Sequence, residues 1–124
     1  MRILHEMKLL GIRFAHVAPG EDADGIADAL KGLGLATADF PEAEGMPGAI
    51  FPTTDQSSWV EVWHAGEGMP PGTMLQLIVE DADAAAATAK RSGLNPQGPM
   101  DAHGERIYFL ALPGGLQMSF QSKL

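Results

Sequence analysis

Apolar and polar residues alternate with a period of two along several short stretches of the chain, as they do in strands that bury one face. Two alanine-rich segments carry acidic residues at their starts and basic residues at their ends, which is typical of helices. The pattern predicts helices within residues 21–35 and 80–94, and strands at residues 11–17, 49–51, 59–63, 73–79, 107–110 and 116–120, with weaker strands at 37–40 and 97–100.

The two predicted helices are related by an internal repeat with an offset of 59 residues. The tetrapeptide Glu-Asp-Ala-Asp occurs at 21–24 and again at 80–83, and eight of the fifteen positions from 21 to 35 are identical at 80 to 94. Similarity that begins and ends together in this way indicates a duplicated structural unit.

The ends of the repeated helices are marked in the sequence. Asp22 or Asp24 is predicted to cap the first helix, and Asp81 or Asp83 the second, because a carboxylate accepts from the free N–H groups of a first turn. The expected stop signals are glycines in a left-handed conformation, Gly34 and Gly93.

Each half of the chain fits the order β-α-β-β-β, so we expect an α+β protein of one domain, residues 1–124. The first module is predicted at 7–65 and the second at 73–122, joined by the Gly- and Pro-rich residues 64–73. Alternation turns Val60 and Val62 toward the helix, and Trp59, Glu61 and Trp63 away from it. Helix-free faces with polar groups among apolar ones are typical of a small-molecule cavity.

Composition narrows the functional classes. The 124 residues include 8 basic and 16 acidic side chains, a formal net charge of −8, and no cysteine. Thiol nucleophiles, disulfides and zinc-thiolate sites are therefore excluded. The acidic balance argues against nucleic acid as a partner, since such binding relies on Lys and Arg. Without a signal-peptide core or a long apolar segment, we expect a soluble, cytoplasmic protein with no membrane partner.

The segment 104–115, Gly-Glu-Arg-Ile-Tyr-Phe-Leu-Ala-Leu-Pro-Gly-Gly, and the duplicated modules resemble the vicinal oxygen chelate superfamily. This superfamily includes glyoxalase I, bleomycin- and fosfomycin-resistance proteins and extradiol dioxygenases. The chain departs from the family's hairpin pattern at Leu112 and Leu116, where the family commonly has Asp and Asn. The resemblance implies a glyoxalase-like fold, with two βαβββ modules in tandem, mixed sheets curved around a cavity and helices on the outer face.

The resemblance also implies positions for one divalent metal ion, held by first-strand and last-strand residues of both modules. Glu61 falls on one of these positions, and His16 lies at or beside another. Ser119 and Met74 occupy the remaining two, and Gln76 is two residues further along. Because only His16 and Glu61 are plausible ligands, we predict a site with no metal.

We therefore expect a protein, similar to the bleomycin-resistance branch, that binds a small and partly apolar molecule without a cofactor. The alternative is a metal-dependent lyase, isomerase or dioxygenase of the same superfamily. The predicted lining is His16, Trp59, Glu61, Trp63, Met74, Gln76, Phe109 and Ser119.

Several roles stay open for individual residues. Glu61 is the candidate general base, or else a carboxylate paired with Arg13 or Arg106. Trp59 and Trp63 are expected to stack on a ligand or to fill a subunit interface. The acidic balance favours a cationic ligand, and the family resemblance implies a homodimer.

Overall fold

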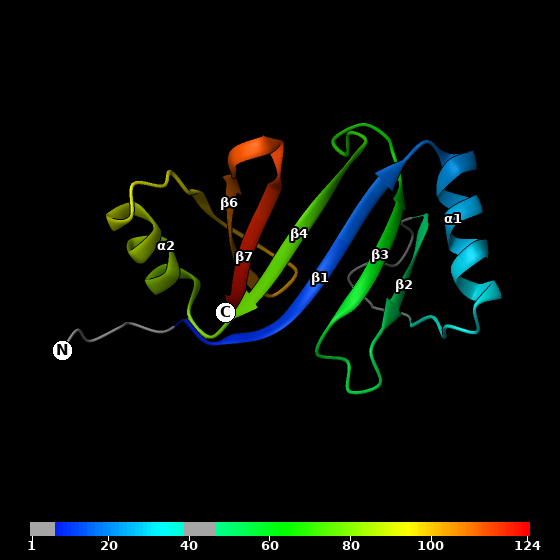
Figure 1. The fold of residues 1–124 in the computed structure, drawn as a ribbon, viewed down its shortest axis with the longest axis horizontal. Coiled ribbons are helices and arrows are strands. Elements are labelled where there is room, and N and C mark those ends of the chain that lie inside the picture. Colours follow the sequence, from blue (N-terminus) through cyan, green and yellow to red (C-terminus); the bar gives the residue numbers. More distant parts are fainter. Residues whose placement is uncertain (1–6, 39–46) are drawn as a thin grey trace. The chain divides into compact units, whose positions relative to one another are not determined.

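The computed structural model describes residues 7–38 and 47–124. The chain divides into two compact units, which are considered separately below. The first unit is Arg13–Met74; the second contains the described residues up to Ile12 together with Leu75–Leu124. Strands β1 (Leu9–Ala18) and β4 (Gly72–Val79) each run from one unit into the other (Figure 1).

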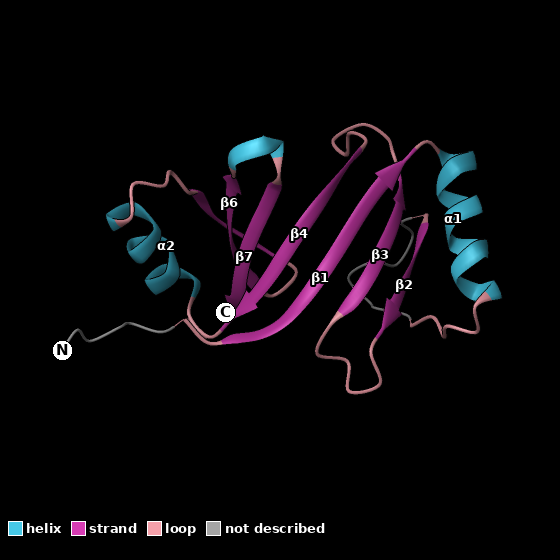
Figure 2. Ribbon diagram, in the orientation of Figure 1, coloured by secondary structure: helices cyan, strands magenta, loops and turns pink. Residues whose placement is uncertain are grey.

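The first unit holds one helix and a three-stranded arrangement with the order β2-β3-β1. Its elements after β1 are α1 (Gly20–Gly32), β2 (Gly48–Pro52) and β3 (Trp59–His64). Strand β3 is parallel to β1 and antiparallel to β2 (Figure 2). The parallel pairing of β1 and β3 is possible because α1 and β2 lie between them in the chain and provide the crossover.

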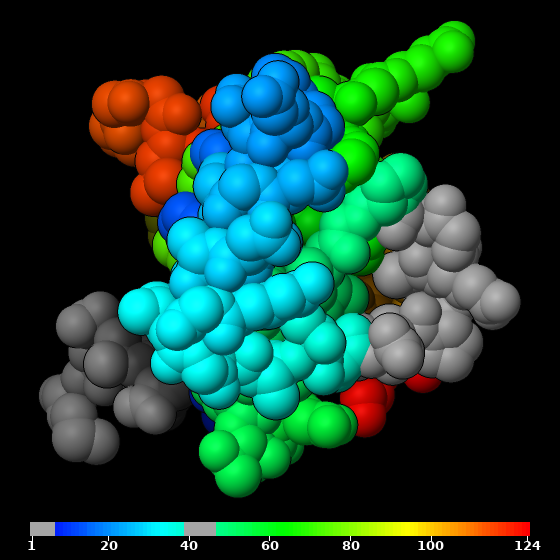
Figure 3. Space-filling model, turned by 90° about the vertical axis from the view of Figure 1, so that its right-hand side faces the viewer, coloured from blue at the N-terminus to red at the C-terminus, as the bar shows by residue number. Residues whose placement is uncertain are grey.

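Helix α1 packs against β3 through small and branched apolar side chains, and Figure 3 shows the helix in front of the strands of this unit. Ala18, Ala23 and Val62 are buried there, and Ile26, Leu30 and Val60 are partly buried against them. Val60 and Val62 therefore face α1 as the alternation predicted, and residues 59, 61 and 63 point to the opposite face of β3.

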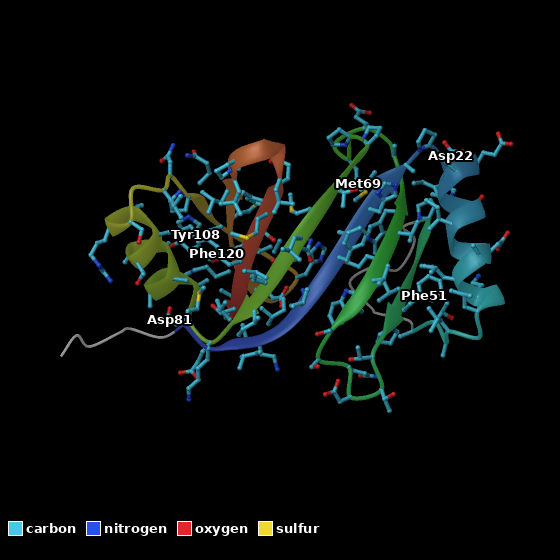
Figure 4. All side chains as sticks on the ribbon, viewed as in Figure 1. Asp22, Phe51, Met69, Asp81, Tyr108 and Phe120 are labelled. Carbon is cyan, nitrogen blue, oxygen red and sulfur yellow. The ribbon has the colours of Figure 1, made fainter. Side chains whose placement is uncertain are left out.

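The second unit contains α2 (Ala82–Arg91) and the strand order β4-β7-β6-β5. Strands β5 (Gln97–Ala102), β6 (Glu105–Ala111) and β7 (Gln117–Lys123) form antiparallel pairs, and a short 3₁₀ turn, Pro113–Gly115, precedes β7. The buried cluster under α2 includes Tyr108 and Phe120, whose rings stack with centroids 5.5 Å apart (Figure 4). Met118 also packs on this cluster, so the apolar face of β7 turns to the helix as predicted.

The predicted helix ends are confirmed for α2 and partly wrong for α1. Asp81 is the N-cap of α2, and its side chain accepts from the Ala84 N–H at 3.1 Å. At α1, Pro19 holds the cap position without a side-chain bond, because the helix starts at Gly20 and places Asp22 in its first turn. Both predicted stop glycines have a positive φ, 89° at Gly34 and 85° at Gly93.

The weaker strand predictions have mixed outcomes. Strand β5 is present where residues 97–100 suggested it. Thr37 and Ala38 are outside any strand, although the Ala38 N–H donates to the Ile50 carbonyl at 2.9 Å, and the rest of the predicted strand lies outside the described residues. None of the helices in residues 7–38 and 47–124 is long and apolar enough to cross a membrane.

Candidate functional site

The face of β3 opposite α1 presents an aromatic, a carboxylate and a second aromatic side chain in succession. Trp59, Glu61 and Trp63 occupy this face because they alternate with the two valines that pack on the helix. Same-face residues on one strand are separated by roughly 6.6 Å, so Trp59 and Trp63 are the nearest residues to Glu61 on its own strand and face. The three residues therefore belong to one surface, as the sequence predicted.

The strand register adds neighbours to this surface, because directly paired residues project to the same face of a sheet. On β1, Arg13 is opposite Trp59, Ala15 is opposite Glu61, and Val17 is opposite Trp63. On β2, Ile50 pairs with Glu61 and Gly48 with Trp63. We call this surface the tryptophan face; its members are Arg13, Ala15, Val17, Gly48, Ile50, Trp59, Glu61 and Trp63.

Two contacts organise the polar groups of the tryptophan face. The guanidinium carbon of Arg13 is 3.9 Å from the centroid of the Trp59 ring, which is a stacked cation–π arrangement. The Nε1–H of Trp63 donates to Oε1 of Glu61 at 3.2 Å. Each tryptophan is thus associated with one charged side chain, and the charges have opposite signs. The net charge of the whole chain consequently does not describe this surface.

His16 is placed differently from the prediction. It pairs with Val62 and therefore projects to the α1 side of the sheet, with its Nδ1 2.7 Å from Oγ1 of Thr73. A shift of one residue in register reverses the face of every side chain in a strand. The expectation that His16 and Glu61 share one wall is therefore wrong, and Arg13 is the charged residue of β1 on the tryptophan face.

The remaining predicted residues are distributed over both units. Met74, on β4 in the first unit, and Gln76 and Phe109, on β4 and β6 in the second, are half-buried. Ser119, on β7, is 1% exposed and lies opposite Phe109 in the register of β6 and β7.

Ser119 belongs to a buried hydrogen-bond chain that the sequence reasoning did not identify. Its hydroxyl donates to Oε1 of Gln121 at 2.7 Å, and Nε2 of Gln121 donates to Oε1 of Glu105 at 3.2 Å. The available signal was the period-two spacing of Ser119 and Gln121 on β7. Glu105 was not predictable in the same way, because it joins the chain from β6 through the strand register.

The metal ion implied by the family resemblance can be tested against the donor set. Of its expected positions, Glu61 supplies a carboxylate on the tryptophan face, whereas His16 lies on the opposite face. Ser119 supplies only a hydroxyl, which is bonded to Gln121. The residues present therefore do not fit a divalent metal ion held by four protein ligands. Within residues 7–38 and 47–124, no three His, Cys, Asp or Glu side chains are grouped so that they could hold a metal.

A separate charged cluster ties α2 to β5 and β6 in the second unit. Tyr108 donates to Oδ1 of Asp83 at 2.6 Å, and Arg106 donates to Oδ2 of Asp83 at 3.0 Å. Arg106 also makes a bidentate pair with Asp101 at 2.9 and 3.1 Å.

These hydrogen bonds account for the altered titration of the cluster. The bond from Tyr108, followed by that from Arg106, lowers the pKa of Asp83, and Arg106 lowers the pKa of Asp101. The bond to Asp83, together with burial, raises the pKa of the Tyr108 hydroxyl. Since Arg106 bridges both carboxylates and Tyr108 also donates to Asp83, we interpret the cluster as one that fastens α2 to β5 and β6.

No protein-family model and no curated protein sequence matches the chain, whereas solved structures do. A structure described as an NAD-dependent benzaldehyde dehydrogenase from Legionella pneumophila matches with a TM-score of 0.65 and 11% identity, over 91% of this chain and 99% of that one. Methylmalonyl-CoA epimerase from Mycobacterium tuberculosis matches with a TM-score of 0.63 and 17% identity, over 94% and 87%.

A hypothetical protein from Bacillus halodurans C-125 matches with a TM-score of 0.61 and 20% identity, over 95% of each chain. The likeness to these structures extends over nearly the whole chain. Identities this low establish a common fold, and a common fold carries many different activities.

Proposed function

Because the chain has the glyoxalase-like fold of the vicinal oxygen chelate superfamily, we propose that it binds a small, partly apolar molecule on the tryptophan face. The observation that carries this proposal is the alternation of Trp59, Glu61 and Trp63 on one face of β3. A carboxylate between two indoles combines a large apolar contact area with one oriented polar group. Small-molecule sites have this composition.

The apolar part of the ligand is expected to contact the indole rings and the aliphatic residues beside them. Ala15 and Ile50 lie on either side of Glu61 in the register, and Val17 lies beside Trp63. Tryptophan suits this role since its ring is apolar while its N–H donates a hydrogen bond. The surface around Glu61 is therefore mainly hydrocarbon, which strengthens any hydrogen bond that the carboxylate accepts.

The polar part of the ligand is expected to be a cationic donor that Glu61 accepts. Arg13 has the same sign as such a group and lies at the Trp59 end of the face. Repulsion from Arg13 would direct the cation to Glu61 and the Trp63 end. The proposed ligand is thus an apolar amine whose ammonium group donates a hydrogen bond to Glu61.

Intrinsic fluorescence gives a direct test. The chain has two tryptophans, and both lie on the tryptophan face. The probes are cyclohexylmethylamine, cyclohexanecarboxamide and cyclohexanecarboxylate, which share one ring and differ in charge. We expect the emission to change saturably as the amine is added. The Kd for the amine should be at least about tenfold lower than the Kd for the carboxylate.

Matched variants identify the residue responsible. Glu61→Gln should remove the preference for the amine while leaving the binding of the neutral carboxamide unchanged. Glu67→Gln removes the same charge from an exposed position between β3 and β4 and should leave the preference intact. A parent protein that binds all three probes equally, or none of them, would contradict the proposed function.

A further inference from the structure

Beyond the identity of the ligand, we infer that Trp63 is a positioning residue that orients the carboxylate of Glu61, and that Gly48 makes this arrangement possible. The inference rests on the proposed function for its consequence in binding, but its geometric part stands without a ligand. The hydrogen bond from Trp63 Nε1 to Glu61 Oε1, at 3.2 Å, joins two side chains of the same strand. Such a bond selects one rotamer of the Glu61 side chain.

The indole itself is held in place by its surroundings. Trp63 is only 8% exposed, unlike the half-buried Trp59 on the same face. It pairs with Gly48 of β2, and a Cβ atom built at Gly48 would lie 2.3 Å from Cε3 of the indole. The ring therefore occupies the volume that any other residue at position 48 would fill. A fixed ring gives its N–H a fixed direction.

The same site also explains the need for glycine on backbone grounds. The Cβ at position 48 would lie 2.4 Å from the Val62 carbonyl oxygen, an atom of the β3 backbone that cannot move without disturbing the pair of strands. Gly48→Ala must consequently shift either the indole or the strand. In both cases the N–H of Trp63 leaves its alignment with Glu61.

For the ligand, this arrangement means that Glu61 is presented in advance. One carboxylate oxygen is engaged by Trp63 within the protein, so the side chain does not have to be ordered when the ligand binds. Avoiding that loss of rotamer freedom improves affinity. A hydrogen bond from an N–H group stabilises a carboxylate more than a carboxylic acid, so loss of the Trp63 bond should be felt by the ionised form of Glu61.

The test compares Trp63→Phe with Trp59→Phe, which makes the same substitution two positions away on the same face. The readout is the pH midpoint at which the Glu61 carboxyl ¹³C resonance titrates. We expect the midpoint to rise by about 0.5 to 1 pH unit in Trp63→Phe, because a charge-assisted hydrogen bond is lost. In Trp59→Phe the midpoint should move less. Gly48→Ala should raise it in the same direction while retaining the indole N–H.

A second measurement follows the indole ¹H–¹⁵N signals, first in the unaltered chain and then in Glu61→Gln. The indole N–H hydrogen of Trp63 should exchange with solvent more slowly than that of Trp59. The chemical shift of the Trp63 indole ¹H–¹⁵N signal should change as Glu61 titrates, and this change should vanish in Glu61→Gln. In binding, Trp63→Phe should weaken cyclohexylmethylamine about five- to tenfold and leave cyclohexanecarboxamide unchanged.

The outcomes separate the two proposals. If the Glu61 midpoint is the same in Trp63→Phe and the parent, the positioning role is refuted, whatever happens to binding. If the midpoint rises but no probe binds to the parent, the positioning role stands and the proposed function fails.

Discussion

Replacing Val62 by Ala tests the packing that holds the tryptophan face in place. Val62 is 1% exposed, and it lies between Glu61 and Trp63 in sequence while packing against α1 on the other side of β3. The substitution removes two methyl groups, worth about 1.6 kcal/mol at about 0.8 kcal/mol each. Incomplete collapse of the cavity adds up to about 1 kcal/mol. We expect the free energy of unfolding to fall by about 1.6–2.6 kcal/mol.

The assay is urea denaturation followed by tryptophan fluorescence, because both tryptophans lie on the same strand as the substitution. For 124 residues the unfolding entropy is about 0.26 kcal/mol per kelvin, so thermal unfolding followed by the same fluorescence should show Tm lower by about 6–10 °C. The m value should stay constant, since the surface exposed on unfolding hardly changes.

Val60→Ala is the matched control, since it makes the same chemical change on the same face of β3 at a half-buried position. Its cost should be clearly smaller, at about 1 kcal/mol or less. If the two variants are equally destabilised, or if Val62→Ala costs less than about 1 kcal/mol, then α1 does not pack on β3 as described.

Three further predictions concern the second unit. Asp81→Ala removes the N-cap of α2 and should cost about 1 kcal/mol in thermal or urea unfolding, whereas Asp81→Asn should cost little. Gly93→Ala forces a φ of 85° on a residue with a Cβ and should cost about 1–2 kcal/mol, and equal stability would show that the turn relaxes. Arg106 lowers the pKa of Asp101 in the folded protein. The pair therefore contributes to stability above the unfolded pKa of about 3.9, and this contribution is lost as pH falls through the lower pKa of folded Asp101. Arg106→Gln should therefore flatten the loss of stability between about pH 5 and pH 2, and a parallel pH profile would refute this role of the pair.

The sequence by itself determined the elements and the faces of each strand, because those properties depend on neighbours within the same segment. Alternation along β3 separates Val60 and Val62 from Trp59, Glu61 and Trp63 without any knowledge of the partner strands. The repeat located both helices, and the left-handed glycines that follow them were predicted from local backbone sterics. Trp59, Glu61 and Trp63 of β3 were accessible to this reasoning for the same reason.

Only the tertiary structure decided which side chains meet across strands. The parallel register of β1 and β3 places Arg13, and not His16, on the face of Glu61, and a local pattern cannot choose between registers one residue apart. The register of β2 puts Gly48 beneath the indole of Trp63, and that of β6 brings Glu105 to Gln121. These pairings join residues far apart in the chain, so they depend on how separate segments bury their apolar faces together, a condition that no single segment contains.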